Sequence, residues 1–297
     1  MQLIDGKGIS EAILQELRAE TDAIRERRER SPHLAAVLVG KDPASETYVS
    51  HKIRACKLVG YESTLLRYSA QTTEADLLKI ISTLNDDDAI DGFIVQLPLP
   101  DQIEESKVIE HIAPEKDVDG FHPINIGRMS KGLPALMPAT PAGIIEMLKR
   151  TNIETSGKHC VVIGRSNIVG TPMSILMSRK AEVGNATVTL CHSRTQDLVK
   201  HTQMADILIV AAGQPEMIGP EHVKSGAVVI DVGMHRKNDP SKRAGYRLVG
   251  DVQFEAVKDI ASAITPVPKG VGPMTIAMLL RNTLTAYQRR KARAGLN

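Results

Sequence analysis

The chain has 297 residues, of which 42% are hydrophobic and 24% are charged, which is typical of a globular protein of about two domains. This composition excludes a disordered chain, a fibrous repeat and a small disulfide-stapled scaffold. The 37 basic and 35 acidic residues leave a net charge of +2, which gives no support to a nucleic-acid-binding or membrane-surface protein.

The few cysteines and the start of the chain restrict its location and its metal chemistry. Cys56, Cys160 and Cys191 are far apart and form no CxxC pair, so we expect neither disulfides nor a metal site. The first residues carry no export pattern, and no apolar run approaches the roughly 20 residues of a membrane helix. We therefore expect a cytoplasmic protein.

The first half of the chain alternates between helical and extended patterns. Apolar spacing predicts helices and strands in turn, at 8–30, 34–40, 45–59, 63–68, 73–84 and 92–97, with Thr73 as the N-cap of the third helix. This alternation predicts parallel strands in a layered α/β domain, whose sites collect at the carboxyl ends of the strands. Gln96 lies at such an end.

A loop with a cluster of carboxylates follows, at 114–123. In it, Asp117-Val118-Asp119-Gly120 has two interpretations. An aspartate can cap the backbone of a turn, or a carboxylate can pair with an amide or amidine of a ligand. A calcium loop is disfavoured, because the remaining ligands and the closing glutamate are missing.

The second half begins with a predicted domain boundary near residue 140, where Thr140 and Pro141 suit the N-cap and first position of a helix. A strand at 158–163 then runs into a turn from Gly164 to Gly170 that opens another helix. A strand, a glycine-containing turn and a helix N-terminus together predict a phosphate-binding site. Gly170 would let the backbone or a phosphate come close.

The next strand, at 186–190, decides the expected cofactor. NAD-binding folds usually place an acidic residue at its end for the ribose hydroxyl, but here Ser193 and Arg194 follow it. Arg165 lies in the preceding glycine turn. These residues favour a 2′-phosphate, so we predict NADP over NAD; the alternative is two ordinary surface arginines. Further strands are predicted within 206–213, 227–233 and 263–264, then a Pro/Gly-rich loop and a last helix to about Arg289.

Five stretches, in order along the whole chain, resemble the bifunctional 5,10-methylenetetrahydrofolate dehydrogenase/5,10-methenyltetrahydrofolate cyclohydrolase family. They are Tyr48-Val49-Ser50-His51-Lys52, Gln96-Leu97-Pro98-Leu99-Pro100, Lys116-Asp117-Val118-Asp119-Gly120, Gly164-Arg165-Ser166-Asn167-Ile168-Val169-Gly170, and Thr265-Pro266-Val267-Pro268 with Gly270-Val271-Gly272-Pro273-Met274-Thr275. One such stretch would be weak, but five in register are specific.

The resemblance implies a three-layer α/β substrate domain and a Rossmann-like NADP-binding domain with a cleft between them. We expect residues 1–140 with 272–297 to form the folate-binding catalytic domain, and 141–271 to form the NADP-binding domain. The implied activity is oxidation of 5,10-methylenetetrahydrofolate with NADP, then hydrolysis of the 5,10-methenyl product to 10-formyltetrahydrofolate. It also implies a homodimer in one-carbon metabolism and purine biosynthesis, with no nucleic-acid or membrane partner.

The resemblance also implies roles in the folate site. Lys52 looks like the catalytic lysine of the cyclohydrolase, and Gln96 is expected to hydrogen-bond it. Tyr48, one helical turn earlier, falls on the same face and is expected to pack on the p-aminobenzoyl ring. Asp119 resembles the carboxylate that binds the pterin amide and amino groups. Without the other motifs, Tyr48 and Lys52 would be read as a surface helix pair.

The resemblance assigns the NADP contacts to Gly164, Arg165, Ser166, Ser193 and the backbone near Met234. One departure is Lys269, where the family usually has glycine, and it motivates the alternative of a dehydrogenase with weak or no cyclohydrolase activity. A further alternative, a nucleotide-binding sensor without catalysis, would explain the glycine turn but not Lys52 and Asp119 together.

Overall fold

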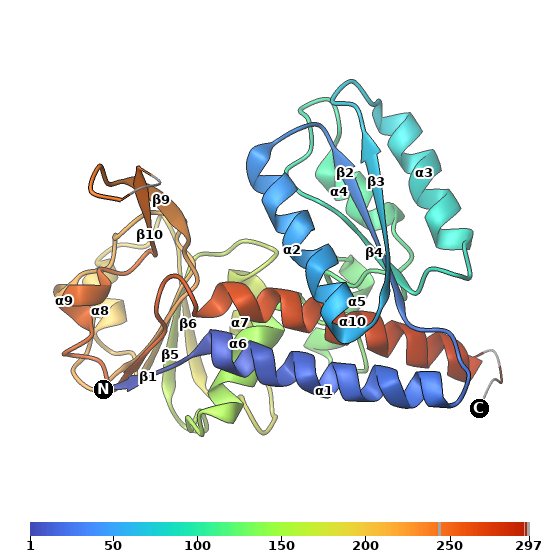
Figure 1. Cartoon of the computed structure of the whole chain (residues 1–297). Helices are drawn as coiled ribbons and strands as arrows, with labels where there is room; N and C mark the ends of the chain where they lie inside the picture. The colour runs from blue at the N-terminus through green and yellow to red at the C-terminus, as the bar shows by residue number, and fades with distance from the viewer. Residues whose placement is uncertain (243–244, 294, 296–297) are drawn as a thin grey trace. The chain divides into compact units, whose positions relative to one another are not determined.

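The computed structural model describes residues 1–242, 245–293 and 295 (Figure 1). The chain forms two compact units: unit 1 comprises Met1–Ser10 and Thr140–Thr275, and unit 2 comprises Glu11–Ala139 and Ile276–Asn297. The expected domains, 1–140 with 272–297 and 141–271, differ from these units at 1–10, at 140 and at 272–275. The first residues join unit 1 because β1 (Gln2–Leu3) pairs with β11 (Ala263–Ile264). Residues 294, 296 and 297 of the expected first domain lie outside the described residues.

Unit 2 is built on a three-stranded parallel sheet in the order β3-β2-β4. Its strands are β2 (His33–Val39), β3 (Glu62–Tyr68) and β4 (Gly92–Val95). Its helices are α2 (Pro43–Val59), α3 (Glu74–Asp86), α4 (Glu105–His111) and α5 (Pro123–Ser130), with most of α1 (Gly6–Glu26) and α10 (Val271–Arg293).

The sheet of unit 2 is covered on both faces. Alternate residues of β2, such as Ala35 and Val37, pack in one cluster with residues of α3 and α4, such as Leu77 and Val108. Helix α2 lies across the sheet from α3 (Figure 1). This arrangement confirms the predicted three-layer α/β organisation.

Capping residues account for several helix ends. Thr73 accepts a hydrogen bond from the Asp76 backbone N–H at the start of α3, as predicted. Helix α2 begins at Pro43, earlier than expected, because Asp42 caps it through the Ser45 N–H. Helix α1 ends at Glu26 rather than at residue 30, and Arg28 adopts a φ of 60° just beyond it.

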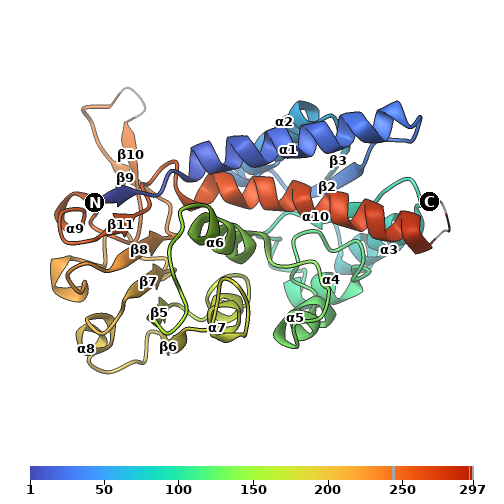
Figure 2. The same ribbon diagram turned by 90° about the horizontal axis from the view of Figure 1, so that it is seen from below.

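Unit 1 contains a six-stranded parallel sheet in the order β1-β11-β8-β7-β5-β6, part of which is seen edge-on in Figure 2. Its longer strands are β5 (His159–Ile163), β6 (Thr187–Cys191), β7 (Ile207–Val210) and β8 (Val228–Asp231). Strands β5, β7 and β8 read as nearly continuous apolar runs because they are almost entirely buried. This sheet confirms the predicted Rossmann-like fold.

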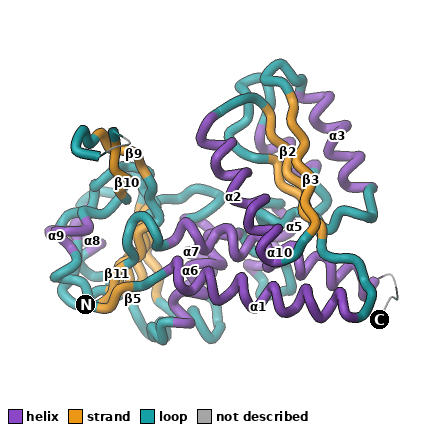
Figure 3. The backbone as a smooth tube through the Cα atoms, in the orientation of Figure 1, coloured by secondary structure: helices purple, strands orange, loops and turns teal. Residues whose placement is uncertain are grey.

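The other elements of unit 1 lie around this sheet. They are α6 (Ala139–Arg150), α7 (Gly170–Ser178), α8 (Leu198–Thr202), a 3-10 turn (Pro220–His222), α9 (Phe254–Val257) and the antiparallel pair β9 (His235–Asn238) and β10 (Tyr246–Val249) (Figure 3). Thr140 is not the N-cap of α6, because the helix already begins at Ala139, and its hydroxyl lies 2.9 Å from that of Thr275. No helix in the described part of the chain could cross a membrane.

Candidate functional site

Lys52 and Gln96 form a side-chain pair inside unit 2. Lys52 is 9% exposed on α2, and its Nζ donates a hydrogen bond of 3.2 Å to Oε1 of Gln96. The Gln96 backbone N–H donates to the Val37 carbonyl, and its side-chain Nε2 donates to the Leu97 carbonyl at 2.6 Å. Because Nε2 is engaged, the amide is oriented with Oε1 towards Lys52. The expected hydrogen bond between the two side chains is therefore present.

Tyr48 lies one turn before Lys52 on α2, and its side chain differs from Lys52 in exposure. Tyr48 is 41% exposed, although a tyrosine ring is large and mostly apolar. Successive positions i and i+4 share one helix face. The helix thus places a surface ring next to a buried amine.

The loop after α4 resolves the two interpretations of its carboxylates. Asp117 caps the turn: its carboxylate accepts hydrogen bonds from the backbone N–H groups of Gly120, Phe121 and His122, and from Nδ2 of Asn125. The Asp119 carboxylate accepts no hydrogen bond from any residue that the structure describes, although its backbone carbonyl accepts one from Ala139. The turn interpretation applies to Asp117, and Asp119 keeps its acceptors for another donor.

Electrostatic effects on Asp119 come from its surroundings in unit 2. Burial raises the pKa of Asp119, the Lys52 ammonium lowers it, and the Asp117 carboxylate raises it. Because Asp119 is only half-buried and its carboxylate has no hydrogen-bond donor among the described residues, the group is suited to accept hydrogen bonds from a ligand.

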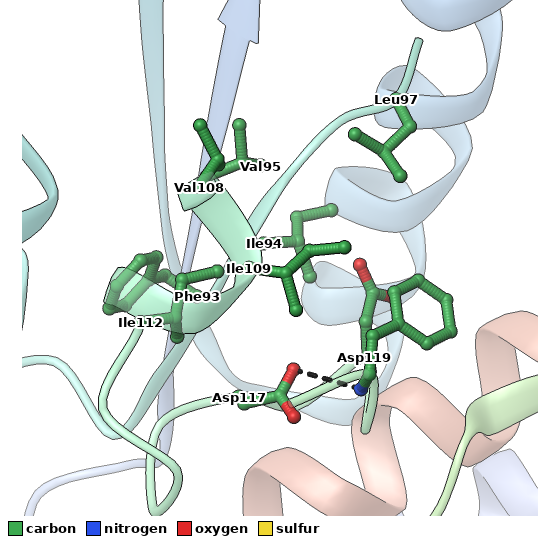
Figure 4. Close-up of a pocket in the computed structure, with 10 residues that line it drawn as sticks. Phe93, Ile94, Val95, Leu97, Val108, Ile109, Ile112, Asp117 and Asp119 are labelled. Atoms are coloured by element: carbon green, nitrogen blue, oxygen red, sulfur yellow. Dashed lines mark hydrogen bonds between the residues drawn. The ribbon is translucent and has the colours of Figure 1, made fainter. Parts of the chain in front are cut away.

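A pocket next to this loop has one apolar and one acidic side (Figure 4). Its apolar side comes from Phe93 on β4, Val108 on α4 and Ile112 just after α4. Its acidic side comes from Asp117 and Asp119. The dashed line in Figure 4 marks the hydrogen bond that fixes Asp117 to the loop backbone. Among the four residues that the resemblance assigns to the folate site, Asp119 is the one that lines this pocket.

Close backbone packing explains why the turn after β5 has glycine at both of its ends. Gly164 has a φ of 106°, and a Cβ there would lie 2.1 Å from the Ala211 carbonyl oxygen. A Cβ on Gly170 would lie 1.9 Å from the carbonyl oxygen of Gly164. The close approach expected at Gly170 is therefore made by the chain's own backbone. Ser166 lies inside the turn, where its Oγ accepts from the N–H groups of Val169 and Gly170.

The carboxyl ends of β5 and β6 carry exposed basic and hydroxyl groups. Arg165 follows β5, and Ser193 and Arg194 follow β6, its neighbour in the sheet. In the described part of the chain, neither guanidinium has a hydrogen-bond or ion-pair partner. Met234, 41% exposed, follows β8 at the same edge. The turns after β5 and β6 fit a phosphorylated dinucleotide, because they offer two cations and a hydroxyl.

Two aspartates at this edge were not anticipated from the sequence. Asp251 is fully buried and accepts hydrogen bonds from the Ala212 and Gly213 N–H groups and from Nε2 of His235. Asp231, at the end of β8, accepts from the Asp251 backbone N–H. The available signal was an aspartate directly after each of two apolar segments, ending at Ile230 and at Gly250.

Two family models match the chain. One, described as the tetrahydrofolate dehydrogenase/cyclohydrolase catalytic domain, matches residues 4–119. The other, described as the NAD(P)-binding domain of the same family, matches residues 138–291. Among curated relatives, the bifunctional protein FolD of Bacteroides thetaiotaomicron is 60% identical over 286 residues, which are 96% of this chain and 98% of that protein.

Solved structures give the same result. The bifunctional FolD methylenetetrahydrofolate dehydrogenase/cyclohydrolase of Campylobacter jejuni is similar with a TM-score of 0.91 and 45% identity, over 98% of this chain and 99% of that one. The Trypanosoma brucei enzyme, solved with NADP cofactor and inhibitor, is similar with a TM-score of 0.90 and 39% identity, over 97% of both chains. This chain therefore belongs to the tetrahydrofolate dehydrogenase/cyclohydrolase family.

Proposed function

We propose that this enzyme oxidises 5,10-methylenetetrahydrofolate with NADP and then hydrolyses the methenyl product to 10-formyltetrahydrofolate, using the residues described above. Its family membership makes it a bifunctional dehydrogenase and cyclohydrolase that uses NADP. The observation that carries the residue assignment is the part-buried hydrogen bond between Lys52 and Gln96, together with the Asp119 carboxylate, which has no hydrogen-bond donor among the described residues.

Asp119 and Tyr48 bind and orient the folate. The Asp119 carboxylate accepts hydrogen bonds from the amide and amino N–H groups of the pterin, which supply the donors that the described residues do not. The exposed ring of Tyr48 packs on the p-aminobenzoyl ring. Since the reacting carbon lies between these two parts of the substrate, the two contacts align it for both reactions.

Lys52 serves the hydrolysis. Water adds to the methenyl carbon, and the adduct opens when one ring nitrogen leaves with a proton. The Lys52 amine is placed to move these protons, because Gln96 fixes its Nζ and burial shields it from bulk water. Gln96 is a positioning residue, since its own contacts are to Lys52 and to backbone.

The edge of the sheet in unit 1 holds the cofactor. Bound NADP supplies a hydride acceptor for the dehydrogenase reaction. Arg165 and Arg194 pair with its 2′-phosphate, and Ser193 donates a hydrogen bond to it. Gly164, Ser166 and Gly170 shape the turn, and the backbone near Met234 contacts the cofactor. These residues bind and orient it, and hydride transfer needs no acid or base from them.

The Lys52→Ala variant tests the assignment in an assay that follows NADPH and methenyltetrahydrofolate together. We expect cyclohydrolase activity to fall by at least about 100-fold while the dehydrogenase remains, so that methenyltetrahydrofolate accumulates in step with NADPH. The matched control is Lys57→Ala, an exposed lysine on the same helix, which should leave both signals unchanged. An equal loss of both activities in Lys52→Ala would contradict the separate role of Lys52.

The Arg165→Ala variant tests the cofactor assignment. Loss of a charge-assisted contact to the 2′-phosphate should raise the KM for NADP by about tenfold. The KM for NAD, which lacks that phosphate, should change far less and serves as the internal control. An unchanged ratio of the two KM values would show that Arg165 does not bind the 2′-phosphate.

We also propose that the enzyme forms a homodimer in the cytoplasm and supplies formyl groups for purine biosynthesis, on the strength of the family resemblance. Light scattering coupled to size-exclusion chromatography tests the dimer, for which we expect about twice the chain mass of 32.3 kDa. The comparisons give no support to the alternative of a weak cyclohydrolase caused by Lys269.

A further inference from the structure

A buried carboxylate joins three segments at the edge of the unit 1 sheet. Asp251 Oδ2 accepts hydrogen bonds of 2.7 and 3.0 Å from the Ala212 and Gly213 N–H groups, which follow β7. Its Oδ1 lies 2.7 Å from Nε2 of His235, the first residue of β9. Because the side chain is fully buried, these three donors replace its entire hydration, and removing any of them is costly.

Asp231 in turn holds the backbone of Asp251 in place. Asp231 Oδ1 accepts from the backbone N–H groups of Asp251 and Gly233 at 2.9 and 3.0 Å, and its Oδ2 accepts from Val252. Burial raises the pKa of Asp231 to about 7, against these donors, which lower it. The residues on both sides of Met234 are thus held: Gly233 by Asp231 and His235 by Asp251.

Asp251 also determines where an anion can bind along this edge. Two consecutive backbone N–H groups, such as those of Ala212 and Gly213, can form an anion-binding concavity. Here a carboxylate from the same unit already fills it. Phosphate groups are therefore directed away from β7, towards the exposed arginines that follow β5 and β6.

We infer that His235 and Asp251 are positioning residues for NADP: their hydrogen bond fixes the Met234 segment, against which the part of the cofactor remote from its 2′-phosphate rests. The inference rests on the proposed cofactor site. His235 acts through Asp251 and the backbone and has no part in the reaction. Its side chain is 23% exposed, so it can be substituted without opening the core.

The His235→Ala variant tests this inference through the two activities of one enzyme. We expect the KM for NADP to rise by roughly fivefold to tenfold with little change in dehydrogenase kcat, because a hydrogen bond to a buried charge is lost. Hydrolysis of methenyltetrahydrofolate needs no NADP and should stay within twofold of the wild type. His235→Gln, which keeps an N–H donor at similar reach, should restore the KM. The matched control is His201→Ala on α8, which should change neither activity.

Two results would overturn the inference. One is an unchanged KM for NADP in His235→Ala when Arg165→Ala raises it, which leaves the cofactor site intact and removes the positioning role. The other is a parallel loss of both activities with a lowered melting temperature, without rescue by His235→Gln, which shows a purely structural role. If neither Arg165→Ala nor His235→Ala changes the KM for NADP, the proposed cofactor site itself is wrong.

Discussion

Asp117 and Asp119 lie two positions apart on one loop, yet their carboxylates differ in their hydrogen bonds to the protein. The Asp117 carboxylate accepts hydrogen bonds from three backbone N–H groups and from Asn125, and it therefore fixes the loop. Asp119 is held in place through its backbone carbonyl, and its carboxylate, which accepts no hydrogen bond from the described residues, is the group that we propose binds the folate. The same residue type is structural or functional according to which donors the fold brings to it.

The Asp119→Ala variant should therefore lose both folate reactions. Since the pterin N–H groups would lose their charged acceptor, we expect kcat/KM to fall by at least about 100-fold for the dehydrogenase and the cyclohydrolase. Steady-state kinetics with each folate substrate checks this prediction. Asp101→Ala, an exposed aspartate of the same unit, is the control. Near-normal kcat/KM in Asp119→Ala would remove Asp119 from the substrate site.

At the scale of elements, the loops between strands and helices contain the strained positions. Gly120 has a φ of 78°, and a Cβ there would lie 2.4 Å from the backbone carbonyl carbon of Met137, so only glycine fits. Lys269 has a φ of 86°, in the loop before α10, where its carbonyl accepts the Lys7 N–H. Lys269 therefore has a strained backbone conformation, which a glycine at this position would adopt without a steric penalty.

The Lys269→Gly variant should consequently be more stable than the wild type. Glycine adopts this conformation without a Cβ penalty, which we expect to raise the free energy of unfolding by about 1 kcal/mol. Urea unfolding followed by circular dichroism measures the change. The control is Lys131→Gly, at an exposed position with a φ of −88°, where glycine should give no gain. A lower stability in Lys269→Gly would mean that the lysine side chain makes a compensating contact.

At the scale of the whole molecule, charge networks hold together segments that are distant in sequence. The buried Asp91 carboxylate receives hydrogen bonds from Arg30, just after α1, and from Arg290 near the end of α10. Nearby, Glu29 contacts Lys291 and the Tyr287 hydroxyl, both on α10. These contacts lie within unit 2 and connect its first helix to its last.

Glu29 makes the stability of this network depend on pH. Hydrogen bonds from Lys291, Arg27 and Tyr287 lower the pKa of Glu29 from 4.5 to about 2. A lowered pKa in the folded state gives stability that is present above about pH 4.5 and is lost as the pH falls towards 2. The stability difference between the wild type and Glu29→Gln should therefore shrink on acidification.

Urea unfolding midpoints measured between about pH 7 and about pH 3 check this prediction. Glu26→Gln removes one charge at the end of α1, three residues before Glu29, and is the control for a change in net charge. A stability difference that stays constant over the whole range would show that the contacts of Glu29 do not stabilise the fold.

The sequence by itself determined the features that depend on neighbouring residues. Periodic apolar positions predicted the main strands and helices, and Thr73 predicted a cap that is present. The glycine turn and the absence of an acidic residue after β6 predicted an NADP-binding unit, in agreement with the family. These signals are readable because each arises within a few residues or one helical turn.

The tertiary structure decided which distant groups meet. It paired β1 with β11, so that the first residues belong with unit 1. It gave the capping role to Asp117 rather than Asp119, and it brought His235 to Asp251. Short elements such as α5 and β9 were likewise unpredicted. A buried charge or a two-residue strand is stabilised by partners that are far away in the sequence, and no local sequence pattern identifies those partners.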